Sequence, residues 1–186
     1  MIDADIQAMF AVPLVHIRIQ NWEMKKRVLL KLMYESTMRR DTSSDRLTTD
    51  YHNQFINDEV GIYNKDIQDL FGEEIDYLAE EMHLKDATVQ MSWFERSGQF
   101  DYHTVHNHGY HGFSSVVFIK FDENAHEATK FVCPYYGFLH QDVIIHSPDV
   151  KEGDIIFFPS CISHFTNPNK SKKERLILSF NLKCTD

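Results

Sequence analysis

The residues best suited to chemistry are histidines concentrated in one stretch, Tyr102–Lys120. It holds four of the eleven histidines of the chain: His103, His106, His108 and His111. Side chains two positions apart on a strand point to the same face, so His106 and His108 can share a metal ion if this segment is extended. His164 follows the strand-like run Gly153–Pro159 and can complete the site from a neighbouring strand. The predicted metal ligands are therefore His106, His108 and His164.

The other two histidines of this stretch are weaker candidates. His103 lies three positions before His106, so in an uninterrupted strand it faces the opposite side. His111 follows Gly109 in an expected turn. The alternative for the whole group is that these imidazoles line a barrel and bond only to backbone groups or water.

The last strand-like run, Glu174–Leu182, separates an apolar face from a polar one. The apolar face carries Leu176, Leu178, Phe180 and Leu182, and the other face carries Arg175, Ile177, Ser179 and Asn181. If the apolar face packs on helices, Arg175 points into the barrel, where a guanidinium is costly unless an anion meets it. A carboxylate ligand would meet that need. The alternative places Arg175 in solvent, paired with Glu174 or Asp154.

The elements that must position these residues change in kind along the chain. A strand is expected over 10–19, a helix after a capping Asn21, a long polar loop over 39–57, and a second helix from Asn64 to Met82. The first helix should bury Met24, Val28, Leu29, Leu32 and Met33. Short strands follow, over 88–95, 100–107, 113–121, 129–132, 143–146, 154–158 and 175–182. This order predicts an α+β fold whose β part is a barrel or sandwich.

Composition limits the class of protein. A chain of 186 residues with 42% hydrophobic content is expected to form a single domain, with 1–86 supporting a core at 87–186. Three cysteines at unrelated spacings fit neither a disulfide scaffold nor a paired-cysteine zinc site, which favours a reducing, cytoplasmic setting. No signal peptide or membrane-spanning run is apparent. A formal charge of −9 disfavours nucleic acid as a partner.

The order of these features resembles the 2-oxoglutarate and Fe(II)-dependent oxygenases: a pair of ligands, the Gly153–Pro159 strand, His164, and then Arg175 eleven residues later. Segments 93–108, 114–116 and 175–181 resemble an uncharacterised bacterial and phage branch of that superfamily. The resemblance implies a double-stranded β-helix, a cupin-like jelly roll with N-terminal helices packed on one sheet. It also implies Fe(II) and 2-oxoglutarate, with Arg175 and Ser179 holding the distal carboxylate of 2-oxoglutarate. The expected reaction is hydroxylation of an unidentified small molecule or peptide, and a homodimer is compatible with it.

Two positions depart from the pattern of that superfamily. His108 stands where the family carries Asp or Glu, the carboxylate of a 2-His-1-carboxylate triad. Ile177 stands two residues after Arg175, where the family carries serine, and the serine comes later, at Ser179. Asp101 is expected to face away from the site, while Asp122 and Glu123 lie beyond the next strand, so no acid replaces the missing one. The prediction is thus a site of three imidazoles, which leaves a bound metal more positively charged.

Two other classes of function stay open. A cupin-type three-histidine metalloenzyme, a dioxygenase or an isomerase, would use the same histidines, and Gly153, Pro159 and His164 match the spacing of a second cupin motif. The glutamate expected shortly after the histidine pair is absent, because Gly112 and Phe113 occupy those positions. The third class is a non-catalytic jelly-roll binding protein that has lost the chemistry.

Overall fold

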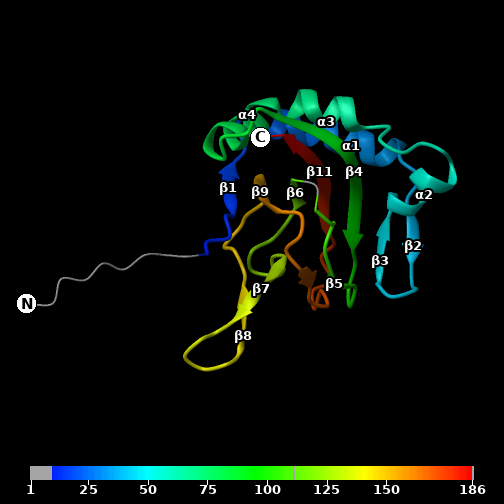
Figure 1. Ribbon diagram of the computed structural model, residues 1–186. Coiled ribbons are helices and arrows are strands. Elements are labelled where there is room, and N and C mark those ends of the chain that lie inside the picture. Colours follow the sequence, from blue (N-terminus) through cyan, green and yellow to red (C-terminus); the bar gives the residue numbers. More distant parts are fainter. Residues whose placement is uncertain (1–9, 111, 186) are drawn as a thin grey trace, which may run out of the picture.

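The computed structural model describes residues 10–110 and 112–185, whose strands form two antiparallel sheets (Figure 1). The larger, 7-stranded sheet has the order β1-β9-β6-β11-β4-β3-β2, and the 4-stranded sheet has the order β5-β10-β7-β8. The strands are β1 (Val15–Arg18), β2 (Arg39–Asp41), β3 (Leu47–Thr49), β4 (Asp86–Ser97), β5 (His103–His106), β6 (Phe113–Lys120), β7 (Lys130–Tyr136), β8 (Val143–His146), β9 (Asp154–Pro159), β10 (His164–Thr166) and β11 (Arg175–Thr185).

The chain passes back and forth between the two sheets. From β4 onward it visits the large sheet, the small sheet and the large sheet again, until β11 returns between β4 and β6. This interleaving is the double-stranded β-helix, so the predicted jelly roll is confirmed. Each strand predicted between Thr88 and Leu182 has an observed counterpart.

The helices cover one face of the large sheet, as Figure 1 shows for α1, α3 and α4. They are α1 (Trp22–Glu35), α2 (Tyr51–Ile56), α3 (Asn64–Leu70) and α4 (Gly72–Glu81). The prediction of N-terminal helices packed on one sheet is therefore confirmed. Among the helices within residues 10–110 and 112–185, none is long and apolar enough to cross a membrane.

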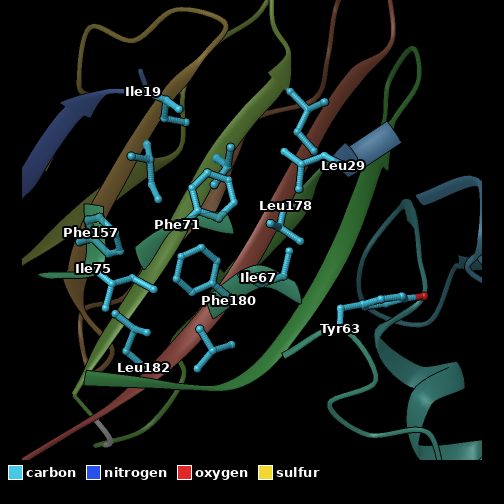
Figure 2. Packing of buried hydrophobic residues seen from close by; sticks show 14 of the residues in the cluster. Ile19, Leu29, Tyr63, Ile67, Phe71, Ile75, Phe157, Leu178, Phe180 and Leu182 are labelled. Atoms are coloured by element: carbon cyan, nitrogen blue, oxygen red, sulfur yellow. The ribbon is translucent and has the colours of Figure 1, made fainter. Parts of the chain in front are cut away.

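Alternating side chains of the large sheet supply two hydrophobic cores. Leu178 and Phe180 of β11 face the helices and pack in one core with Phe71 and Ile75 of the helical layer, as Figure 2 shows. Ile177, the residue before Leu178, faces the small sheet and joins the core that contains Phe118, Phe131 and Phe158. Because the apolar face of β11 is taken by the helices, the alternate side chains, among them Arg175 and Ser179, must lie inside the barrel.

The predicted loop over 39–57 is instead the hairpin β2–β3 followed by α2. The strand β3 extends the large sheet by pairing with β4, at Thr48 opposite Arg96 and Thr49 opposite Glu95. Strands of three residues are too short to give a detectable period, so this part of the prediction was wrong. The expected strand over 10–19 is also shorter, Val15–Arg18.

Both predicted helices differ from expectation in their details. The helix expected over 64–82 is two helices, separated at Phe71, whose ψ of 19° is not helical. In α1 the buried stripe is Lys25, Leu29 and Met33, and Met24 and Val28 are exposed. Lys25 can be buried because its ammonium group donates to both carboxylate oxygens of Glu74 on α4, each at 2.8 Å. Asn21 precedes α1 with a φ of 53° and makes no side-chain capping bond.

Replacing Phe71 by alanine tests the packing of helices on the sheet. Phe71 is fully buried and its ring stacks on Phe180, with centroids 5.9 Å apart, so Phe71→Ala should lower the free energy of unfolding by about 3–5 kcal/mol. Urea denaturation measures this. Tyr34→Ala, at an exposed position of α1, should change the stability by less than about 0.5 kcal/mol. A loss below about 1 kcal/mol for Phe71→Ala would contradict the described packing.

Candidate metal centre

Three histidines meet at one end of the small sheet. His164 on β10 lies directly opposite His106 on β5 in the antiparallel pairing. His108 follows β5, and its backbone N–H donates to the carbonyl of Ser160 at 2.9 Å, which ties it to the loop before β10. One ring nitrogen from each of the three residues lies within 4.8 Å of the others. The three histidines singled out from the sequence are thus brought together.

Hydrogen bonds on the outer side of each ring determine which nitrogen is free. The Nδ1 atoms of His106 and His164 lie 2.8 Å and 2.9 Å from the backbone carbonyls of Thr104 and Ile162. A carbonyl only accepts, so each Nδ1 carries the proton and each Nε2 keeps its lone pair. In His108, Nδ1 lies 2.8 Å from Oδ1 of Asn181 and therefore donates to it. All three Nε2 atoms are left as potential metal ligands.

The surroundings keep these three rings neutral. Burial, reinforced by the neighbouring His106, lowers the pKa of His108 to about 4 and that of His164 to about 3. Burial also lowers the pKa of His106, and the nearby His103 adds to the effect. Since a metal binds the unprotonated imidazole, the group is ready to accept a cation at neutral pH.

Arg175 lies buried in the barrel without an anionic hydrogen-bond partner. Its side chain is on β11, the residue is 4% exposed, and Nη2 donates to the hydroxyl of Thr129 at 3.2 Å. Its Nε–H finds no hydrogen-bond partner among the described residues. Burial lowers the pKa of Arg175 to about 10, and the charge of Glu95 opposes that effect, so the side chain remains a cation. The alternative of a solvent-exposed Arg175 paired with Glu174 or Asp154 is wrong.

Two cavities adjoin the histidines. An outer cavity of about 370 Å³ opens beside His106 and His108 and is walled by the β2–β3 hairpin, Tyr51 and Trp93. An inner cavity of about 10 Å³ is lined by all three histidines, Ser179 and Thr129. Because Thr129 also accepts the bond from Arg175, the guanidinium lies just behind the wall of the inner cavity.

Comparison with known families agrees with this geometry. A sequence model of the family described as "Putative 2OG-Fe(II) oxygenase" matches residues 91–181, the segment that runs from β4 to β11 and carries all three histidines and Arg175. This part of the chain belongs to the 2-oxoglutarate/Fe(II)-dependent oxygenase superfamily. No curated protein matches the chain significantly.

Solved structures of this superfamily share the fold. The epimerase SnoN of nogalamycin biosynthesis has 13% identity and a TM-score of 0.61, covering 90% of this chain and 76% of its own. A prolyl-4-hydroxylase of Pseudomonas putida has 10% identity and a TM-score of 0.60, covering 91% of each chain. The collagen prolyl hydroxylase of Paramecium bursaria Chlorella virus 1 has 14% identity and a TM-score of 0.56, covering 93% of this chain and 96% of its own. At these identities the likeness concerns the fold.

His103 departs from the expectation that it faces away from His106. Its ring stacks on that of His106, with centroids 3.9 Å apart and planes at 22°. The reason is a bulge in the oxygenase barrel: His164 pairs with His106 while Thr166 pairs with His103, so β5 holds one more residue than β10. His103 lies outside the group of three. His111 lies outside the described residues.

Glu95 is the residue at this site that the sequence analysis missed. Its carboxylate accepts from Nε1 of Trp93 at 2.8 Å and lies 3.3 Å from Nδ1 of His103. Burial acts to raise the pKa of Glu95, but His103, Trp93 and His106 together outweigh burial and hold that pKa well below its usual range. Glu95 borders both cavities of the oxygenase site. The alternation along 93–97 could have revealed it, because it places Glu95 on the face opposite the apolar Phe94.

The acids considered from the sequence are indeed engaged elsewhere. Both oxygens of Asp101 accept from Arg40, at 2.5 and 2.6 Å, and Oδ2 also accepts from the backbone of Gly98 at 2.8 Å. Asp122 pairs with Lys173. The group of possible metal ligands in this oxygenase barrel consists of imidazoles alone among the described residues.

Asn181 provides a test of how His108 is oriented. Loss of a hydrogen bond that orients a metal ligand usually weakens metal binding by about 10–100-fold, so Asn181→Ala should weaken Fe(II) binding in that range under anaerobic calorimetry. Asn124→Ala, in an exposed loop, serves as the matched control and should leave the affinity unchanged. Equal affinities for the two variants would mean that Asn181 does not orient a metal ligand.

Proposed function

We propose that this chain is an Fe(II)- and 2-oxoglutarate-dependent oxygenase in which His106, His108 and His164 bind the metal through Nε2. The observation that carries the proposal is the pairing of two unsatisfied groups in one barrel: three neutral imidazoles directed at one another, and a buried guanidinium with a free N–H. The first suits a transition metal and the second suits a carboxylate. A ligand that bridges the two groups must both coordinate the metal and present a carboxylate to the guanidinium.

The donor set fits a divalent iron ion. Three neutral nitrogen ligands held by their outer hydrogen bonds leave coordination positions for a chelating co-substrate and for dioxygen. When bound, iron and 2-oxoglutarate would supply the oxidising chemistry, in which oxidation of 2-oxoglutarate to succinate and carbon dioxide is coupled to hydroxylation of a C–H bond. The protein itself would hold the reactants in place and limit the access of water.

Arg175 would neutralise the distal carboxylate of 2-oxoglutarate, assisted by the hydroxyl of Ser179. Ser179 is buried, lies on the same face of β11 as Arg175 and lines the inner cavity. That cavity, of about 10 Å³, is smaller than 2-oxoglutarate, so side chains at its wall must shift when the co-substrate binds. We expect Glu95 and His103 to shift, because both line the inner and the outer cavity and neither is a proposed metal ligand.

The outer cavity would admit the substrate beside His106 and His108. Its charged walls are Asp41, Asp45 and Glu95, and neither lysine nor arginine is among its lining residues. An acidic wall disfavours anionic substrates, so we propose an uncharged or cationic small molecule or peptide side chain. The volume of about 370 Å³ is suited to a group of that size.

A three-histidine metalloenzyme that needs no 2-oxoglutarate is the second candidate. The observation in its favour is the donor set itself, three imidazoles without a carboxylate. Arg175 weighs against it, because such an enzyme leaves the buried guanidinium unexplained. Metal binding without 2-oxoglutarate binding would favour this second candidate.

Substitution of Arg175 tests the co-substrate. Arg175→Ala should weaken 2-oxoglutarate binding by about 2 to 4 kcal/mol, since it removes a charge-assisted contact, and Arg175→Lys should restore only part of the loss. Calorimetry of 2-oxoglutarate into metal-loaded protein measures both, and the affinity for the metal alone should stay unchanged. Absence of 2-oxoglutarate binding by the metal-loaded wild type would refute the proposal.

Substitution of the histidines tests the ligand set. His164→Ala should abolish stoichiometric Fe(II) binding, whereas His108→Asp should retain it, because a carboxylate at that position is also a good ligand for iron. Metal content is measured by atomic absorption after anaerobic loading. His140→Ala, at an exposed position of the β7–β8 turn, is the matched control and should bind iron like the wild type. Full retention of iron by His164→Ala would exclude this ligand set.

A further inference from the structure

The hairpin β7–β8, at the edge of the small sheet opposite β5, carries a large apolar surface. It projects from the barrel, as Figure 1 shows, and its tip exposes Phe138 at 90% and Leu139 at 75%. The segment before β1 adds to this surface, since Phe10 packs on Tyr135 with ring centroids 5.6 Å apart. The other exposed apolar residues of the hairpin are Tyr136, Val143, Ile144 and Ile145. Surfaces of this kind usually mark an interaction site.

The strand β8 also presents an open sheet edge. It is the last strand of the small sheet, and its outer edge is unpaired within the described residues. All of Val143, Ile144, Ile145 and His146 are exposed. The strand has neither proline nor lysine, the residues by which monomeric proteins commonly block such an edge. Its β-branched side chains instead favour continued pairing.

We propose that a second copy of this chain pairs with β8 in antiparallel register about a twofold axis at Ile144. Ile144 then faces Ile144 of the partner subunit, and Val143 faces Ile145 of the partner subunit. Asp142 faces His146 of the partner subunit, once on each side of the axis. The two small sheets become one continuous sheet, and the contact is the same from both sides, as a twofold interface requires.

The charges of the hairpin favour a second copy of this chain as the partner and favour the register centred on Ile144. This register sets every apolar residue against an apolar one and every Asp142 against an imidazole, pairs that stabilise a sheet. A shift by one residue would set Val143 against His146 of the partner subunit and leave Asp142 opposite Ser147 of the partner subunit. In addition, residues 130–147 hold one lysine and one aspartate in a chain of net charge −9, so charge repulsion between two copies is weak at this hairpin.

An apolar cavity lies on the same face of β8. It measures about 190 Å³, and Ile144 and His146 line it together with Val12, Phe131 and Phe158. Pairing through Ile144 brings the cavities of the two copies next to each other across the axis. The β5 edge with the metal site is the opposite edge of the small sheet, so the pairing leaves the metal site accessible.

Sedimentation velocity across micromolar concentrations tests the dimer. The wild type should be dimeric, and Ile144→Lys, which sets two lysines face to face, should raise the dissociation constant at least about tenfold. Tyr34→Lys, at a 73% exposed position on α1, should leave it unchanged. Retained Fe(II) binding by the Ile144→Lys protein shows that it is folded. A monomeric wild type, or a dimer that Ile144→Lys does not weaken, would overturn the proposal.

Disulfide trapping tests the register. In a background with Cys133→Ser and Cys161→Ser, Ile144→Cys should form a covalent dimer on mild oxidation, because directly opposed residues of antiparallel strands are about 4.5–5.5 Å apart at Cα. Val143→Cys alone should not, since it faces position 145 of the partner subunit, whereas Val143→Cys with Ile145→Cys should. Crosslinking by Val143→Cys alone, or none by Ile144→Cys, would overturn the register. Binding of an extended peptide to a monomer would replace the second copy as the occupant.

Discussion

Three imidazole rings this close together repel one another if they carry the positive charge of the doubly protonated form, so the site depends on all three being neutral. Burial and mutual proximity keep His106, His108 and His164 neutral, and hydrogen bonds to carbonyl or amide oxygens place the remaining proton of each ring on Nδ1. Each Nε2 then faces inward with its lone pair free. The pairing of β5 with β10 sets His106 against His164, so the centre depends on the integrity of the small sheet.

The large sheet supplies the complementary charge. Helices cover one face of β11 and bury its leucines, which forces Arg175 and Ser179 into the barrel. The guanidinium donates to the hydroxyl of Thr129 and lies over the ring of Phe118. The negative charge of Glu95 acts on it and raises its pKa against the effect of burial. Burying a cation with so few partners costs stability, and a carboxylate ligand would recover part of that cost. The candidate metal centre and the proposed anion site would thus both follow from one strand arrangement.

Simple alternation in the sequence was enough to predict much of this arrangement. The period of two in 175–182 predicted which side chains of β11 face the helices, and the spacing of His106, His108 and His164 predicted a metal centre. The jelly roll, with helices on one sheet, followed from the order of elements and the resemblance to the oxygenases. That residues 1–186 fold as a single domain stays a prediction, as do the roles of the individual ligands.

The failures have local physical causes. One extra residue in β5 rotated His103 onto the face of His106, and a bulge of that kind leaves no mark on the period of a strand. Glu95 was missed because a lone acid in a strand resembles a solvent-exposed residue until its partners Trp93 and His103 are known. The short hairpin β2–β3 forms because β4 offers it an edge, which is a tertiary effect.

Diffraction at the iron absorption edge, from crystals grown anaerobically with Fe(II) and 2-oxoglutarate, would show directly whether the three histidines hold the metal. We expect one iron peak with Nε2 of His106, His108 and His164 at about 2.0–2.2 Å, and the distal carboxylate of 2-oxoglutarate on Arg175. An ordered barrel without iron, or an iron site from which His108 points away while a carboxylate or water replaces it, would rule out the three-histidine site.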